Sequence, residues 1–170
     1  PKGSAFLYTR PEKQALVEPL VVGWGWSAER TFTFGSDYLD YLQWLGTIDP
    51  AAYFSVPAAI RFQADHDWPA VRADCRALLQ KALVQIEGVT GQESLYPNGA
   101  GFYEQMAVAA LPPVADLVAF KRRLMEEYRI QIPCIEWGGR QLIRLSIQGY
   151  NTPEEINVLV EALEDLLGRD

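Results

Sequence analysis

Three short apolar runs in the C-terminal half of the chain have the character of β-strands. They cover residues 104–111, 130–134 and 141–147, and each is rich in small or branched apolar side chains. Trp137 and Arg140 flank two glycines between the second and third runs, which is typical of a hairpin turn. The pattern therefore predicts two strands joined by a tight turn, with another strand upstream of them.

Four further stretches repeat their apolar residues at helical spacing or begin with residues that favour a helix start. Asp49 and Asp67 each stand just before a proline-containing start. Gly88 is expected to end the second helix. The last helix has the clearest start, because Thr152 can cap it and Glu155 completes a capping box. The predicted helices are residues 50–65, 67–87, 114–128 and 153–167.

The N-terminal part of the chain has a different pattern. Residues 4–9 and 17–22 are short apolar runs predicted to be strands, and residues 23–27 form an aromatic loop with two glycines. Two long helices meet near residue 67, and helices placed nearly end to end often carry a chain from one domain into the next. We therefore predict an α/β protein with one domain over residues 1–66 and a small α+β domain over residues 67–170.

Composition and charge exclude several classes of function. A net charge of −7 argues against binding to nucleic acid, because phosphates require a basic surface. The basic run 121–123 lies in a predicted helix and is interpreted as a solvated face. No apolar run is long enough to cross a membrane, and no signal peptide is visible. Cys75 and Cys134 form no disulfide framework, which favours reduced thiols and a cytoplasmic location.

No complete set of catalytic residues is evident from the residue pattern. His66 is the single histidine and is interpreted as a surface residue between two acids, although a general base is the alternative. One histidine and two separated cysteines make the common zinc sites improbable, so no metal is expected. Gly23 and Gly25 lack the strand–turn–helix context of a phosphate-binding loop.

Arg144 stands out because it lies inside the apolar strand 141–147. A buried or half-buried arginine needs an anionic partner, and its guanidinium matches a carboxylate in bidentate fashion. A substrate carboxylate is one such partner. The alternatives are a structural ion pair to Glu136 or another acid, and an edge position that faces water.

Residues 144–152, with the sequence RLSIQGYNT, resemble the R-x-S-x-x-x-Y-N-T segment of class V aminotransferases. This family of pyridoxal-phosphate (PLP) enzymes, which have fold type I, includes cysteine desulfurases and the isopenicillin N epimerase-like branch. The resemblance implies that Arg144 binds the α-carboxylate of an amino-acid substrate. It also implies that the two residues after Tyr150 lead into the last helix.

Residues 44–53, with the sequence WLGTIDPAAY, resemble the family's G-T segment and are most similar to the isopenicillin N epimerase-like branch. The resemblance implies that Gly46 and Thr47 contribute to the binding site of the PLP phosphate, with the threonine reaching into the neighbouring subunit of a homodimer. Ile48 departs from the branch, which often has arginine there, and this puts in doubt any polar contact from that position.

The first eight residues resemble the P-x-G-x-x-x-x-Y stretch that follows the family's His-Lys pair. That lysine holds the cofactor. Lys2 lies several positions too late to be the same residue, so the cofactor lysine is expected upstream of Pro1. The resemblance thus implies that the chain is the C-terminal part of a PLP enzyme, with residues 1–66 from the large domain, and that the chain alone is inactive.

The reaction is less well defined than the family. Epimerisation is typical of the most similar branch, whereas transamination and lyase chemistry occur on the same scaffold. A desulfurase would use a nucleophilic cysteine, for which Cys134 is the nearest candidate, but an apolar strand favours an inert thiol. The alternative to an enzyme is a binding module without catalysis, natural or proteolytic.

Overall fold

The computed structural model describes residues 3–30, 32–96 and 101–168. The chain divides into two compact units, Pro1–Asp65 (unit 1) and His66–Asp170 (unit 2). This division lies one residue from the boundary predicted between residues 66 and 67. The assignment of the two parts to the large and small domains of an enzyme remains a prediction. Pro1 and Lys2 lie outside the described residues.

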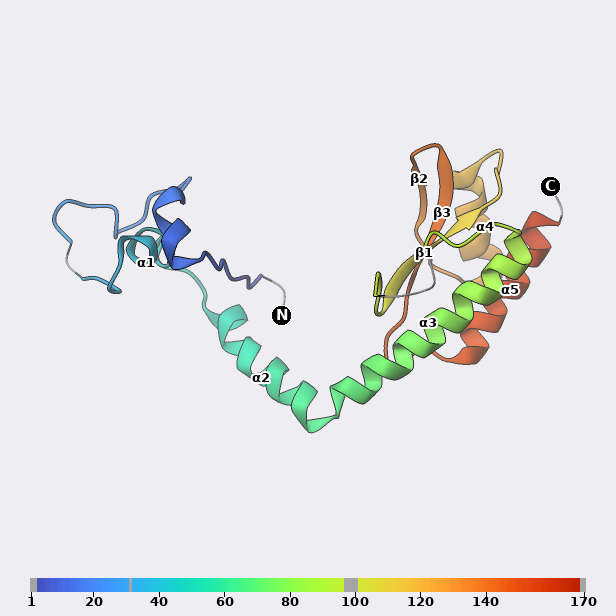
Figure 1. The fold of residues 1–170 in the computed structure, drawn as a ribbon, viewed down its shortest axis with the longest axis horizontal. Helices are drawn as coiled ribbons and strands as arrows, with labels where there is room; N and C mark the ends of the chain where they lie inside the picture. Colours follow the sequence, from blue (N-terminus) through green and yellow to red (C-terminus); the bar gives the residue numbers. More distant parts are fainter. Residues whose placement is uncertain (1–2, 31, 97–100, 169–170) are drawn as a thin grey trace. The chain divides into compact units, whose positions relative to one another are not determined.

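Unit 2 is built on an antiparallel three-stranded sheet (Figure 1). Its strands are β1 (Met106–Leu111), β2 (Cys134–Trp137) and β3 (Arg140–Ser146), in the order β1-β3-β2. The predicted hairpin turn between β2 and β3 is confirmed. Its central residues, Gly138 and Gly139, have φ values of 57° and 74°, which suit the mirror-image turns that match the twist of paired strands.

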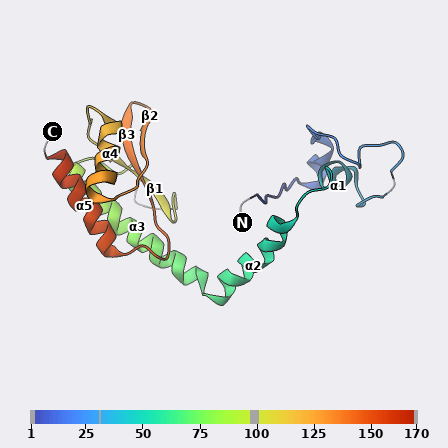
Figure 2. The same ribbon diagram turned by 180° about the vertical axis from the view of Figure 1, so that it is seen from behind.

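Three helices cover one side of this sheet. They are α3 (Trp68–Thr90), α4 (Leu117–Tyr128) and α5 (Pro153–Leu167). α3 packs against α5 and β1, while α4 contacts α5 and β2. Figures 1 and 2 show the three helices along the same side of the strands. The fully buried side chains between sheet and helices include Leu79, Ile86, Leu124, Ile143, Leu163 and Leu166.

The predicted mixed α/β class is confirmed, but several boundaries differ. α3 continues beyond Gly88 and ends at Thr90, where Gly91 adopts a φ of 64° and its amide bonds to the preceding turn. Gly91 is the residue that suits this left-handed position, because it has no Cβ. The run 130–134 pairs with β3 in the ladder only from Cys134 onward.

Unit 1 contains short helices in a largely irregular backbone. They are the 3-10 helix η1 (Pro11–Leu16), α1 (Asp37–Leu42) and α2 (Ala51–Asp65). The strands predicted over residues 4–9 and 17–22 are wrong, because the described residues of unit 1 contain no strand. An isolated apolar run forms a strand only when a neighbouring strand accepts its backbone hydrogen bonds.

The glycine-aromatic loop of unit 1 packs against the backbone around α1. A Cβ placed on Gly25 would lie 1.9 Å from the carbonyl oxygen of Asp40, and one on Gly23 would lie 2.3 Å from that of Trp44. No side chain fits at these separations. The two glycines are therefore explained by close backbone approach.

Asp40 on α1 is the buried charged residue of unit 1, with only 1% of its surface exposed. Its carboxylate accepts hydrogen bonds from the Phe34 amide at 2.6 Å, the Thr33 hydroxyl at 2.8 Å and the Arg30 guanidinium at 2.9 Å. The Phe34 hydrogen bond is the largest influence, and together these donors lower the pKa of Asp40 despite its burial. This network holds Arg30, Thr33 and Phe34 against α1.

The described residues of unit 1 bury no hydrophobic side chain. Large apolar groups instead remain exposed along the whole unit. Because a domain is stabilised mainly by burial of such groups, unit 1 has no hydrophobic core of its own. The exposed residues include Phe6, Tyr8, Leu16, Leu20, Trp24, Leu45, Phe54 and Ile60.

The capping box predicted at the start of α5 is confirmed. The Thr152 hydroxyl accepts from the Glu155 amide, and the Glu155 carboxylate accepts from the Thr152 amide. We expect Thr152→Ala to lower the unfolding free energy of unit 2 by about 1 kcal/mol, because it leaves a helix amide without its partner. Denaturant unfolding followed by circular dichroism measures this loss. Thr152→Ser should restore most of it, and an equal loss in both variants would contradict a capping role.

The Asp40 network predicts loosening of unit 1 in acid. The pKa of Asp40 is lower in the folded chain than in the unfolded chain, so its contribution is complete above the unfolded pKa, about 3.9, and is lost as pH falls through the folded pKa. Trp26 contacts Tyr41 on α1, with ring centroids 4.5 Å apart, and supplies a near-ultraviolet circular dichroism signal. We expect this signal to fall below about pH 4.

Asp40→Asn should lower the near-ultraviolet circular dichroism signal already at neutral pH. The amide nitrogen of the asparagine cannot accept the hydrogen bonds from Arg30 and Thr33. The exposed Asp37 provides the control, and Asp37→Asn should retain most of the signal. A signal that does not change in acid would contradict the role of Asp40.

Candidate functional site

The sheet of unit 2 has one face that none of its described helices covers. Side chains alternate between the faces of a strand, and directly paired residues point to the same side. Ile143 and Leu145 point into the core. The intervening positions of β3 and their partners therefore form what we call the open face. It consists of Met106, Val108, Ala110, Ile135, Trp137, Arg140, Leu142, Arg144 and Ser146.

Arg144 lies on the central strand of the sheet, in the open face. Its backbone pairs with Val108 on β1, and its amide donates to the Pro133 carbonyl at 3.0 Å. Its side chain is exposed. Among the described residues, no ion pair or hydrogen bond engages the guanidinium. Arg144 therefore presents an unpaired cation on a largely apolar surface.

This placement corrects two expectations for Arg144. The first was a buried or half-buried arginine, and the second was a structural ion pair to Glu136. Glu136 pairs with Gln141 on the core-facing side of the sheet and accepts a hydrogen bond from it at 3.3 Å. The side chains of Arg144 and Glu136 thus belong to opposite faces. Of the alternative of an edge position that faces water, the exposure is confirmed, whereas the edge position is wrong because β3 is flanked by β1 and β2.

The residues that follow Arg144 build a rigid connection into α5. Asn151 accepts from the Gln148 amide at 2.9 Å and donates to Glu155 at 3.0 Å. Gln105 donates to the Ile147 carbonyl at 3.1 Å and so holds the end of β3. Asn151 and Thr152, the last two residues of the motif, therefore have a local structural role. Asn151 orders the turn, and Thr152 caps the helix.

Gly46 and Thr47 lie in unit 1, in the loop that precedes α2. Gly46 has a φ of 151°, and a Cβ there would meet no atom within 4 Å. The Thr47 side chain is exposed, and no described residue makes a hydrogen bond to its hydroxyl. Asp49 accepts from the Ala51 amide at 2.9 Å, so its carboxylate serves the start of α2. The Thr47 hydroxyl is therefore exposed and not engaged by the described residues, and its role in phosphate binding stays a prediction.

Cys134 does not have the environment of an activated nucleophile. It pairs with Ile143 and therefore faces the core. Burial raises the pKa of its thiol, with an opposing contribution from Lys121. Because the thiolate is the reactive form, a raised pKa disfavours nucleophilic attack.

Other candidate chemistry from the sequence finds little support. His66 is exposed, just before α3. Within the described ranges, no group of three or more histidine, cysteine or acidic side chains is placed to hold a metal. None of the described helices is both long and apolar enough to span a bilayer.

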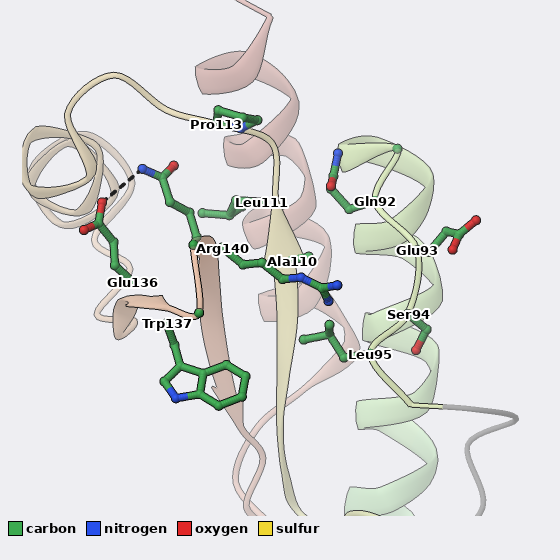
Figure 3. Close-up of a pocket in the computed structure, with 14 residues that line it drawn as sticks. Gln92, Glu93, Ser94, Leu95, Ala110, Leu111, Pro113, Glu136, Trp137 and Arg140 are labelled. Carbon is green, nitrogen blue, oxygen red and sulfur yellow. Dashed lines mark hydrogen bonds between the residues drawn. The ribbon is translucent and has the colours of Figure 1, made fainter.

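A cleft of about 920 Å³ lies beside the open face (Figure 3). Its walls are the 91–95 loop, the end of β1 and the β2–β3 hairpin. Arg140 extends across Ala110 toward Leu95, and Trp137 lies on the same side of the hairpin. Sequence reasoning assigned Trp137 and Arg140 to a turn and missed their position. The period-two pattern of residues 140–146 is the signal that places Arg140 on the same face as Arg144.

The chain is similar to two proteins named isopenicillin N epimerase. It is 31% identical to that of Amycolatopsis lactamdurans over 98% of this chain, and 30% identical to that of Streptomyces clavuligerus over 99%. In each case the match covers 44% of the relative, so the chain spans less than half the length of these proteins. No family model matches the chain.

Among solved structures, part of the chain is similar to 8-amino-7-oxononanoate synthase of Francisella tularensis. The TM-score is 0.43 and the sequence identity is 18%, over 56% of this chain and 28% of that one.

The unpaired Arg144 predicts a residue that is not needed for stability. We expect Arg144→Gln to change the unfolding free energy of unit 2 by no more than about 0.5 kcal/mol, because the exposed guanidinium has no partner to lose. Leu142 lies on the same strand and face but is only 4% exposed, so Leu142→Ala should cost about 2–5 kcal/mol. Denaturant unfolding distinguishes these results. A large loss from Arg144→Gln would indicate a structural role.

Proposed function

We propose that this chain is part of a PLP-dependent enzyme of the class V aminotransferase family, acting on an amino acid in an isopenicillin N epimerase-like reaction. Two observations together support the proposal. The chain is 31% identical to an isopenicillin N epimerase over almost its whole length, and the arginine singled out by its sequence pattern is left unpaired on the open face. Because no acid of the described chain occupies the guanidinium, it can bind the carboxylate of a ligand.

Arg144 is proposed to bind the α-carboxylate of the substrate. The guanidinium is always charged and presents two parallel N–H groups that match a carboxylate. The neighbouring side chains of Val108 and Leu142 are apolar and leave few competing groups. Because β3 is the central strand and its other face is packed into the core, the arginine stands on a rigid base, which favours precise positioning of a substrate.

Gly46 and Thr47 are proposed to bind the phosphate of PLP. The chemistry of the donor fits this group, since an exposed hydroxyl can donate a hydrogen bond to a phosphate oxygen. When bound, PLP supplies an electron sink for the carbanion formed at the substrate Cα. The cofactor lysine is proposed to lie in a segment of the parent protein that precedes Pro1. The residues of this chain would bind and orient the substrate and the cofactor.

Unit 1 supports the proposal of a larger parent protein. Its described residues bury no hydrophobic side chain, and exposed apolar residues extend over its entire length. Such surface is normally covered by further protein. A large domain completed by the rest of the parent, in a homodimer, would provide that cover. The match to less than half of each relative agrees with this interpretation.

The decisive experiment is PLP binding by the intact protein that contains this chain. Borohydride reduction followed by peptide mapping should label a lysine upstream of Pro1, whereas the 170-residue chain alone should remain unlabelled. Thr47→Ala should weaken PLP binding by about tenfold, because a hydrogen bond to a charged group is lost. Thr47→Ser should restore binding.

Arg144→Gln provides the matched control for this experiment. It should leave PLP binding unchanged, because Arg144 is assigned to the substrate and not to the cofactor. If the intact protein takes up no PLP, the proposed enzyme is refuted and a binding module without catalysis becomes the better account. If labelling occurs within residues 1–170, the position of the cofactor lysine is wrong.

A further inference from the structure

The open face carries a second arginine, to which the sequence pattern assigned no function. Arg140 begins β3, and its side chain lies on the same face as that of Arg144. The open face has these two cations and no acidic residue, although the chain as a whole has 22 acids against 15 bases. Charge on this face is therefore the opposite of the net charge of −7.

Arg140 is unpaired among the described residues. No ion pair or hydrogen bond engages its guanidinium. Two acids also line the adjoining cleft, Glu93 and Glu136. Glu136 is held by Gln141, and Figure 3 shows the Glu93 side chain directed away from the Arg140 guanidinium. Neither acid neutralises Arg140, so its charge is available to a ligand.

The surface between the two arginines is apolar. Leu142 lies between them on β3, and Ile135 and Ala110 are its partners on either side. Trp137 pairs with Arg140 and is 73% exposed, which leaves an indole ring at this end of the face. Four residues along a strand separate the two Cα atoms by about 13 Å. A ligand with an anionic group at each end and an apolar middle would therefore meet an arginine at each end and apolar side chains between them.

We propose that Arg140 is a specificity-determining residue that binds a second anionic group at the far end of an elongated amino-acid substrate. Arg144 would bind the α-carboxylate, the middle of the substrate would lie over the partly exposed Ala110 and Ile135 on either side of the buried Leu142, and Arg140 would bind a distal carboxylate. Trp137 would contact the apolar part near that end. The inference rests on the proposed function, because it takes Arg144 as the site of the α-carboxylate.

The test uses the intact protein and a series of α-amino dicarboxylic acids of increasing chain length. Each acid is compared with its ω-amide, which has the same shape but no distal charge. Dissociation constants are measured by calorimetry. At the favoured chain length we expect the acid to bind about tenfold more tightly than the amide, because a charge-assisted hydrogen bond is added.

Arg140→Gln should abolish this preference while leaving the affinity for the amide unchanged. Arg122 lies exposed on α4, on the helix-covered side of the sheet, so Arg122→Gln should keep the preference. Arg144→Gln should weaken binding of acid and amide alike. Trp137→Ala should also weaken both, by a smaller factor. Thermal unfolding of each variant establishes that the fold is retained.

Two results would overturn the inference. The first is equal affinity of the wild-type protein for acid and amide at every chain length. The second is a preference that persists in Arg140→Gln. A failure of the proposed function has a different signature, because the intact protein would then take up no PLP or bind neither the acids nor the amides.

Discussion

The alternation of side chains along β3 is the constraint on which the structure of unit 2 depends. β3 is the central strand, so every residue of it contributes to one of two faces. Ile143 and Leu145 pack into the core formed with α3 and α5, and this packing fixes the register. A shift of one residue would bury Arg144 and expose Ile143. The same packing that stabilises the unit therefore places the arginines on the open face.

The turn after β3 fixes the position of the last helix, α5, relative to the strand. Gln105 and Asn151 hold the end of the strand, and Thr152 with Glu155 caps α5. The motif in residues 144–152 thus combines two physical tasks. Its first residue presents a charge on a fixed strand, and its last residues terminate the strand and start a helix that covers the opposite face. The proposed substrate binding and the folding use different residues of one short segment.

Unit 1 differs from unit 2 in how it is stabilised. Polar and backbone contacts order part of it, and it lacks an apolar core. Asp40 is held by three donors, and Gly25 allows the backbone to approach that residue closely. These contacts define local structure but bury little apolar surface. The hydrophobic residues around them stay exposed, and this is the surface that the proposed larger protein would cover.

Local patterns in the sequence determined the parts of this structure that depend on neighbouring residues. The two glycines of the hairpin, the capping box at Thr152 and the periodic helices were all predictable, because turns and helix ends are stabilised within a few residues. Residues 44–53 also resemble the isopenicillin N epimerase-like branch, and two proteins of that name are similar to the chain.

Only the tertiary structure decided which apolar runs become strands and which face each strand buries. The runs 4–9 and 17–22 have strand character but remain irregular, because a strand forms only where another strand accepts its backbone hydrogen bonds. The apolar strand around Arg144 favoured a buried or half-buried side chain, yet Arg144 is exposed because the helices cover only the other face. Arg140 was assigned to a turn because two glycines precede it, yet it begins β3 and lies on the open face. The sequence indicates which residues can form a strand, whereas packing on the sheet determines which of their side chains are exposed to solvent.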